Sequence, residues 1–209
     1  MGIKNYKTAL LILQKLRQTM VRKDRELLKD VVEIIETYIG GKKSGKQGRV
    51  AGGKKLVIIA VEKKYKKSGH IRLKKIKNAS QKVLNEFILN NVEKGSTIIT
   101  DCWSGYNEII SYGYKHERVI GYVGNYEEIL PTVHKVASLL KRWILGTPQG
   151  AIRNQLNYYL DEFVFRFNRR TSKNRGNLFI RLLEQALKTK TITYKNIIKY
   201  GENKIGGVK

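Results

Sequence analysis

The order of apolar segments along the chain constrains the fold more than any other feature. Five short segments rich in β-branched residues read as strands, at residues 31–38, 56–61, 70–76, 96–100 and 118–123. A helix capped by Ser80 precedes the fourth of them, and a second helix at 105–112 follows it. This order predicts an α/β fold in which a mixed sheet is flanked by helices.

Both ends of the chain are predicted to be helical. Residues 6–21 carry Leu10, Leu13, Leu16 and Met20 at helical spacing, which is typical of a packing helix. The C-terminal third contains a helix that begins at Pro131, a helix with an apolar stripe from Ile152 to Phe167, and an amphipathic helix at 177–187. We therefore expect an N-terminal helical segment at 1–29, a sheet-containing domain at 30–187 and a frayed basic tail at 188–209.

Charge points to a polyanionic partner. Lysine and arginine total 42 against 17 acidic residues, which gives a formal net charge of +25. DNA relieves such self-repulsion by releasing its condensed counterions, so nucleic acid is favoured over a membrane. A lysine-rich surface that reflects an AT-rich genome is the plain alternative, and a ribosomal protein also fits this composition.

Cysteine content and hydropathy indicate in which cellular compartment the protein is expected. The single cysteine, Cys102, excludes an intramolecular disulfide framework and a cysteine-rich zinc site. No apolar segment is long enough to cross a bilayer, and the N-terminus has no signal-peptide core. We expect a cytoplasmic protein that associates with the nucleoid.

A glycine-rich basic loop spans residues 40–55, GGKKSGKQGRVAGGKK. It approaches a phosphate-binding loop, but Gln47 replaces the hydroxyl that Mg²⁺ needs, and glycines follow where a helix should begin. A flexible arm that contacts phosphates, or a solvated hairpin connection, is favoured instead. The predicted DNA contacts are basic residues of this loop and of the C-terminal helices: Lys42, Lys43, Lys46, Arg49, Lys141, Arg142, Arg166, Arg169 and Arg170.

Two side chains are candidates for metal chemistry. Asp101 ends an apolar strand, where ligands gather in mixed α/β sheets, although an aspartate there also caps a following helix. His134 lies on the helix that begins at Pro131, in a polar stripe with Ser138 and Lys141. An imidazole binds divalent metals, but a lone histidine on a helix is more often a surface residue.

Several linked motifs resemble one family. IITDCWSGY, HERV, LPTVHKVASLLKRWILGT and YYLDEFVFRFNRR, in this order, are similar to the ISXO-type DDE transposases of bacterial insertion sequences. VEIIETYIGG is similar to that family's first strand, and YKTALLILQKLR resembles the end of its helix-turn-helix segment. The resemblance implies a ribonuclease-H-like fold that binds double-stranded DNA, both element ends and target, as a homo-oligomer. It further implies three acidic residues holding Mg²⁺ or Mn²⁺ for DNA cleavage and strand transfer.

The chain departs from this family pattern at the site. Asp101 matches the second acid, His134 falls at the third position, and Ile35 occupies the position of the first aspartate. Glu36 should point to the opposite face of the strand, and Glu33 shares the face but lies roughly 7 Å further back. The family's upstream zinc ribbon is also missing. We therefore expect a transposase that is truncated or impaired. The alternative is a catalytically inactive DNA-binding remnant or a domesticated derivative.

Overall fold

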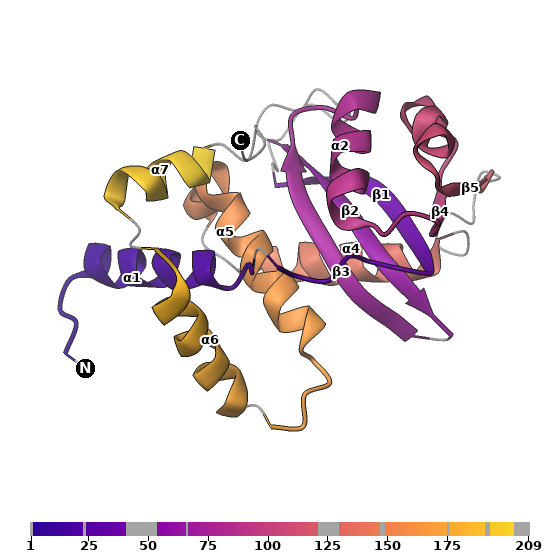
Figure 1. Ribbon diagram of the computed structural model, residues 1–209. Coiled ribbons are helices and arrows are strands. Elements are labelled where there is room, and N and C mark those ends of the chain that lie inside the picture. The colour runs from indigo at the N-terminus through magenta and orange to yellow at the C-terminus, as the bar shows by residue number, and fades with distance from the viewer. Residues whose placement is uncertain are drawn as a thin grey trace. The chain divides into compact units, whose positions relative to one another are not determined.

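The computed structural model describes residues 2–22, 24–40, 54–65, 67–120, 130–146, 149–174, 176–190 and 193–202 (Figure 1). The chain divides into two units, here called the sheet unit, residues 26–153, and the helical unit, residues 1–25 and 154–209. The predicted domain boundaries at 29 and 187 stay a prediction. None of the described helices is long and apolar enough to cross a membrane.

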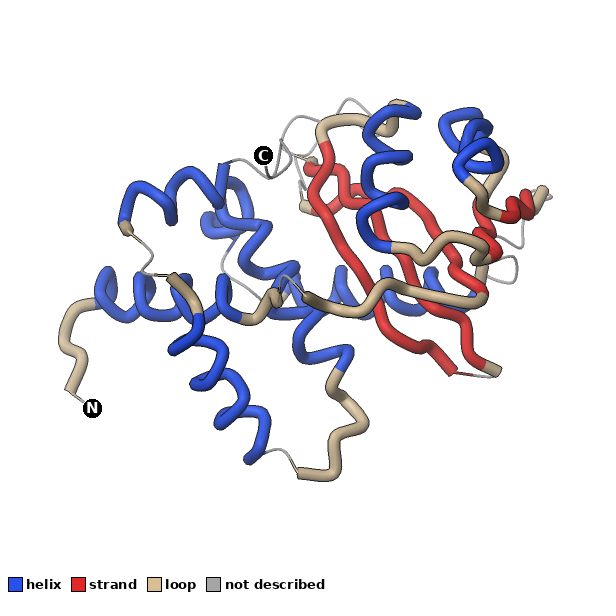
Figure 2. Tube along the Cα trace, viewed as in Figure 1, coloured by secondary structure: helices blue, strands red, loops and turns tan. Residues whose placement is uncertain are grey.

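The sheet unit is built on five strands in the order β3-β2-β1-β4-β5 (Figure 2). Their bounds are Val31–Ile39 for β1, Lys55–Lys64 for β2, Lys67–Ile76 for β3, Thr97–Thr100 for β4 and Lys115–Arg118 for β5. The first three strands pair antiparallel, whereas β1, β4 and β5 run parallel because helices connect them. The predicted α/β class, with a mixed sheet flanked by helices, is confirmed.

Each face of this sheet is covered by different helices, because side chains alternate along a strand. Helix α2 (Gln81–Asn91) and the 3₁₀ helix η1 (Ser104–Tyr112) share one buried core with Val32 and Ile34 of β1. Helix α4 (Pro131–Leu145) packs on β1 and β2 and buries its own apolar stripe. The backbone of α4 is bonded to Glu33, so α4 covers the face that carries Glu33 and Ile35.

The fifth strand lies earlier than predicted. The apolar residues at 118–123 suggested a strand there, but the strand is the polar segment Lys115–Arg118. Its position is decided by its partner: β4 ends at Thr100, so an edge strand must lie level with residues 97–100. Residues 121–123 lie outside the described part of the chain.

The N-terminal helix of the helical unit buries a different face from the one predicted. In α1 (Tyr6–Thr19) the buried side chains are Gln14, Arg17 and Thr19, while Leu13 is 39% exposed. The reason is the polar surface of α5 (Gln149–Asn168), since Gln14 bonds Gln155 and Arg17 bonds Glu162. A second local correction concerns Ser80, which occupies the N-cap of α2 without a side-chain hydrogen bond.

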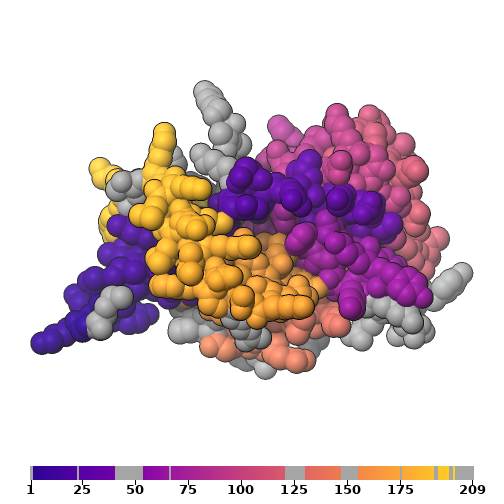
Figure 3. All heavy atoms as spheres, turned by 60° about the horizontal axis from the view of Figure 1, so that its bottom comes forward, coloured from indigo at the N-terminus to yellow at the C-terminus, as the bar shows by residue number. Residues whose placement is uncertain are grey.

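A further helix replaces part of the predicted frayed tail. Helix α6 (Gly176–Lys188) agrees with the predicted amphipathic helix, and α7 (Tyr194–Glu202) follows it. The Tyr158 hydroxyl donates to the Ile197 carbonyl at 2.7 Å, and the Tyr200 hydroxyl donates to Asp161 of α5. Apolar packing and these bonds hold α7, whose Ile197 is 5% exposed. Figure 3 shows the C-terminal helices, orange to yellow, at the surface.

Candidate functional site

Two of the three predicted site positions lie on neighbouring parallel strands. The last pair of the β1–β4 ladder is Glu33 with Ile99, and Ile35 and Asp101 each follow two residues further along their segments. Ile35 is 7% exposed within the sheet, and Asp101 follows β4 directly as an exposed residue. Beyond their last paired residues, the two segments therefore carry one apolar and one acidic side chain.

The third position, His134, lies in the first turn of α4 and is half-buried. The preceding residue, Val133, donates its backbone N–H to Glu33 Oε2 at 2.9 Å. Because Glu33 and Ile35 share a face of β1, this turn lies over the face of Ile35. Among the described residues, no hydrogen bond or ion pair joins His134 to Asp101.

Asp101 has a local structural role as well. Its Oδ1 accepts the backbone N–H of Trp103 at 3.1 Å, which closes the turn before η1. Asp101 lies two residues before the N-cap residue Trp103 and accepts the amide of that residue, so it supports the turn that leads into η1 and is not the helix cap itself. The Asp101 side chain is nevertheless exposed to solvent.

The other residues of the DCWSGY motif fix the loop after β4. The Trp103 indole Nε1 donates to the Ala79 carbonyl at 2.9 Å. A Cβ atom at Gly105 would come within 2.7 Å of the Trp103 ring and 2.9 Å of Leu84, so only glycine fits. The Tyr106 hydroxyl, fully buried, donates to Glu36 Oε1 of β1. This bond links the DCWSGY and VEIIETY motifs, and sequence reasoning missed it.

The environment of Tyr106 keeps it a hydrogen-bond donor. Burial raises the pKa of Tyr106 well above its ordinary value, and the negative charge of Glu36, the bond to it and Asp101 raise it further. Glu36 is therefore held on the η1 face of β1, as the alternation predicted. It does not lie on the face of Ile35.

The second neighbouring acid, Glu33, is also engaged. It is fully buried, and its Oε1 lies 3.4 Å from Lys63 Nζ while Oε2 accepts the Val133 N–H. The N-cap residue of α4, Leu130, has no side chain able to cap, so Glu33 supplies a carboxylate to this helix from a distant strand. Only the tertiary structure reveals this role.

The residues present do not fit the metal centre that the resemblance implies. Within the described ranges, no three His, Cys, Asp or Glu side chains are grouped closely enough to hold a metal ion. Ile35 has no lone pair, and both neighbouring glutamates are engaged in other contacts. Mg²⁺ prefers several oxygen ligands, which Asp101 and His134 do not supply.

The predicted DNA contacts are divided between the two units. Lys141 and Arg142 are exposed on the later turns of α4, in the sheet unit. At the end of α5, in the helical unit, Arg166 pairs with Glu162, and Arg169 and Arg170 stack on Phe165 and Phe167. Lys42, Lys43, Lys46 and Arg49 lie outside the described residues, as do all residues from 41 to 53 of the glycine-rich loop.

Two acids of the YYLDEFVFRFNRR motif hold the helical unit together. Glu162 bonds Arg17 of α1 at 2.7 Å, and Asp161 accepts the Tyr200 hydroxyl of α7. Arg17 also lies 4.2 Å from the centre of the Tyr159 ring. Both acids are buried, so this motif is a packing element around α5.

Solved structures similar to this chain are integrase and transposase chains. The catalytic core domain of BIV integrase is 11% identical, with a TM-score of 0.44, over 77% of this chain and 97% of its own. The HTLV-2 integrase catalytic core domain, solved in complex with magnesium, is 15% identical, with a TM-score of 0.40, over 69% and 90%. The transposase chain of the Mos1 strand transfer complex is 10% identical, with a TM-score of 0.37, over 84% of this chain and 61% of its own.

No curated protein matches the chain. A family model described as the ISXO2-like transposase domain matches residues 27–168, which is more than half of the chain and includes Ile35, Asp101 and His134. The family that the motifs predicted is thereby confirmed, and this chain belongs to the ISXO2-like transposase domains.

Proposed function

We propose that this chain is a DNA-binding transposase whose own catalytic centre is incomplete, so that it cleaves and joins DNA poorly or not at all. The observation that carries the proposal is that Ile35, at the position that the resemblance gives to the family's first acid, is a buried apolar residue. Loss of an acid that would bind the metal ion directly should cost about 4 kcal/mol or more of transition-state stabilisation, which is about a thousandfold in rate.

The neighbouring side chains support this proposal because none offers a ready substitute. Glu36 is bonded to Tyr106, and Glu33 to the first turn of α4. Asp101 and His134 would remain as candidate ligands of Mg²⁺ or Mn²⁺. Imidazole suits softer metals than Mg²⁺, so Mn²⁺ is the better choice for detecting residual cleavage.

Double-stranded DNA is the proposed partner, at the element's ends and at the target. The net charge of +25 and the family membership support it. We further propose that the chain assembles as a homo-oligomer on DNA and associates with the nucleoid. An inactive chain of this kind would bind the element's ends and modulate a complete transposase.

Cleavage assays on DNA that carries the element's ends test the catalytic part. Ile35→Asp should create cleavage in Mg²⁺ that the natural chain lacks, and Ile35→Asn is the matched control of similar size without a charge. Thermal unfolding of each variant checks that the polar side chain is tolerated in the sheet. Robust cleavage by the natural chain in Mg²⁺, abolished by Asp101→Ala, would contradict the proposal.

The second candidate is a DNA-binding remnant that no single substitution reactivates. It is favoured by the hydrogen bonds that Glu33 and Glu36 already accept, because these bonds occupy the two acids nearest to Ile35 in the sequence. Folded Ile35→Asp protein that binds DNA but cleaves nothing in Mg²⁺ or Mn²⁺ would support this candidate over an impaired transposase.

A further inference from the structure

Helix α6 presents apolar side chains to solvent. None of its residues is buried, although its sequence is amphipathic. Four large apolar side chains of this helix are exposed: Phe179, Ile180, Leu183 and Leu187, the last at 88%. Three of them are spaced by four residues, so they form one stripe along the helix, here called the α6 stripe (Phe179, Leu183 and Leu187). A contiguous apolar surface of this kind marks an interaction site, whereas scattered apolar residues do not.

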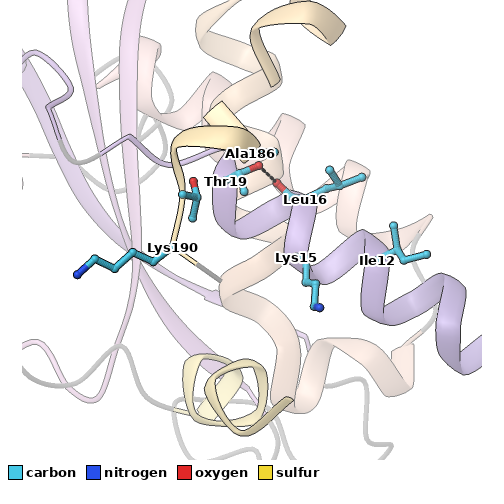
Figure 4. Close-up of a pocket in the computed structure, with 7 residues that line it drawn as sticks. Ile12, Lys15, Leu16, Thr19, Ala186 and Lys190 are labelled. Carbon is cyan, nitrogen blue, oxygen red and sulfur yellow. Dashed lines mark hydrogen bonds between the residues drawn. The ribbon is translucent and has the colours of Figure 1, made fainter. Parts of the chain in front are cut away.

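An apolar groove within the helical unit adjoins the α6 stripe. Helices α1 and α6 contact each other. The groove between them has a volume of about 380 Å³ and is lined by Ile12, Lys15, Leu16, Thr19, Ala186, Thr189 and Lys190 (Figure 4). Ala186 lies three residues after Leu183, on the same side of α6. The groove and the α6 stripe are therefore one continuous surface.

Positive charge surrounds this surface. The two segments that form it, Tyr6–Thr19 and residues 176–190, contain six basic residues and a single acid, Glu184. Lys15 and Lys190 are exposed, and neither has an ion-pair partner within the described ranges. In Figure 4 both lysine side chains extend away from the apolar residues of the groove. The surface is thus apolar in its floor and cationic at its edge.

We infer that the groove and the α6 stripe bind an acidic amphipathic helix of another protein. The apolar residues of such a helix recur at i, i+3 or i+4, and i+7, so they fill the groove and cover the stripe. Its carboxylates lie opposite Lys15 and Lys190, which fixes orientation and disfavours basic partners. This interaction is a further function of the helical unit, and it requires neither DNA binding nor catalysis.

Other occupants match only part of this surface. The backbone of duplex DNA complements the lysines but gains nothing from Ile12, Leu16 or Leu187. A second copy of the chain would bring its own cationic edge, since the helical unit contains 19 lysine and arginine residues against five acids. An anionic bilayer is flat, so it covers the stripe without filling a groove between two helices. Only an acidic helix complements the shape, the apolar floor and the charge together.

A labelled model peptide tests the recognition mode. The probe is a fluorescein-labelled peptide of about 18 residues with leucines at i, i+3, i+7 and i+10, glutamates beside them and alanines elsewhere. Its control has the same composition, with the leucines distributed around the helix. By anisotropy, the natural chain should bind the probe about tenfold or more tightly than the control, and circular dichroism should show helix formation on binding. Equal binding of both peptides, or of neither, would overturn the inference.

Two variants that lose the same apolar surface locate the site. Ile12→Gln/Leu187→Gln alters the groove and the stripe, and Ile110→Gln/Leu145→Gln alters two exposed apolar residues of the sheet unit. The first should bind the probe about tenfold more weakly and the second should bind it unchanged. Both should keep the melting temperature of the natural chain, because the replaced side chains are exposed. Leu187→Gln alone, which should weaken binding about threefold, serves if the double variant unfolds. Equal weakening in both double variants would overturn the inference.

A charge reversal tests the cationic edge. Lys15→Glu/Lys190→Glu should bind the acidic probe about tenfold more weakly and should gain affinity for the same peptide with lysines in place of its glutamates. Lys82→Glu/Lys94→Glu makes the same change of charge on exposed lysines of the sheet unit and should show no such exchange of preference. An equal effect of both variants would reduce the role of charge to the net charge of the chain and overturn the site.

Three further results would assign the surface to a different occupant and overturn the inference. The first is loss of affinity for duplex DNA in Ile12→Gln/Leu187→Gln, with unchanged affinity in Ile110→Gln/Leu145→Gln. The second is a dimer of the natural chain in analytical ultracentrifugation that Ile12→Gln/Leu187→Gln converts to a monomer. The third is co-sedimentation with vesicles of phosphatidylglycerol and phosphatidylcholine that the same variant abolishes. We expect unchanged results for this variant in all three measurements.

Discussion

Each carboxylate near the middle of β1 is committed to a different neighbour. Glu33 is bonded to the first turn of α4, Glu36 to Tyr106, and Asp101 to the turn at Trp103. At the scale of single residues, Ile35 is therefore not compensated by its neighbours.

The contribution of the hydrogen bond between Tyr106 and Glu36 to the free energy of unfolding should be measurable. Tyr106→Phe removes the hydroxyl and leaves the half-buried Glu36 carboxylate without this donor, so the free energy of unfolding should fall by about 1 to 3 kcal/mol. Urea denaturation measures it. Tyr112→Phe is the control, because its ring is 40% exposed, and an equal loss in both variants would show that the bond contributes nothing specific.

His116 gives the folded protein a pH dependence. Burial, and then the positive charge of Arg118, lower the pKa of His116 from its ordinary 6.5, while its Nε2 lies 2.9 Å from Thr100 Oγ1. The unfolded chain thus takes up this proton at a higher pH than the folded chain. The contribution to stability is complete above about pH 6.5 and is lost as the pH falls below it.

Chemical denaturation between pH 8 and pH 5 checks this sign. His116→Gln should flatten the loss of stability on acidification. His70→Gln should retain it, since that ring is 46% exposed beside Glu62. An unaltered acid dependence in His116→Gln would assign the effect to other groups.

At the scale of elements, α4 depends on a cap from outside its own segment. Its N-cap residue makes no side-chain bond, and Glu33 of β1 provides the carboxylate at the positive end of the helix. The residue after the bonded amide is His134, so Glu33 also determines where the first turn presents this histidine. The order of strands, with α4 over β1 and β2, makes the contact possible.

Substitutions of Glu33 test the distant cap. Glu33→Ala should lower the free energy of unfolding by about 1 to 2 kcal/mol and speed hydrogen exchange of the Val133 amide. Glu33→Gln should lower the free energy of unfolding less, because an acceptor for this amide remains. Glu86→Ala is the control, since its pair with Lys74 is partly exposed and should contribute less than about 1 kcal/mol. Unchanged exchange at Val133 in Glu33→Ala would refute the cap.

At the scale of the whole molecule, charge dominates behaviour. A net charge of +25 on 209 residues costs self-repulsion, and both units carry a positive excess. The few buried acids of the helical unit act as internal partners for Arg17 and Tyr200. The remaining positive charge is available to a polyanion.

Affinity for duplex DNA should therefore fall steeply with salt. We expect a slope of log K against log salt of about −5 or steeper, because several phosphates are neutralised at once. Anisotropy titrations of a random-sequence duplex between low and physiological salt measure the slope. An affinity that does not depend on salt would contradict phosphate contacts as the main source of binding.

Local patterns predicted most elements, and the exceptions share a physical cause. The β-branched segments of β1 to β3 and the helix beginning at Pro131 were recognised because their periodicity reflects local geometry. The position of β5 depends on where β4 ends, and the buried face of α1 depends on the polar side chains that α5 offers. The position of a strand and the buried face of a helix therefore depend on contacts with segments that are distant in sequence.

The sequence by itself determined the fold class and the family, because both depend on residue types and their order, and it also predicted that Ile35 stands at the position of the first acid. Only the tertiary structure decided what each acid does. Glu33 and Val133 lie 100 residues apart, and Glu36 and Tyr106 lie 70 residues apart, so no local pattern reveals their bonds.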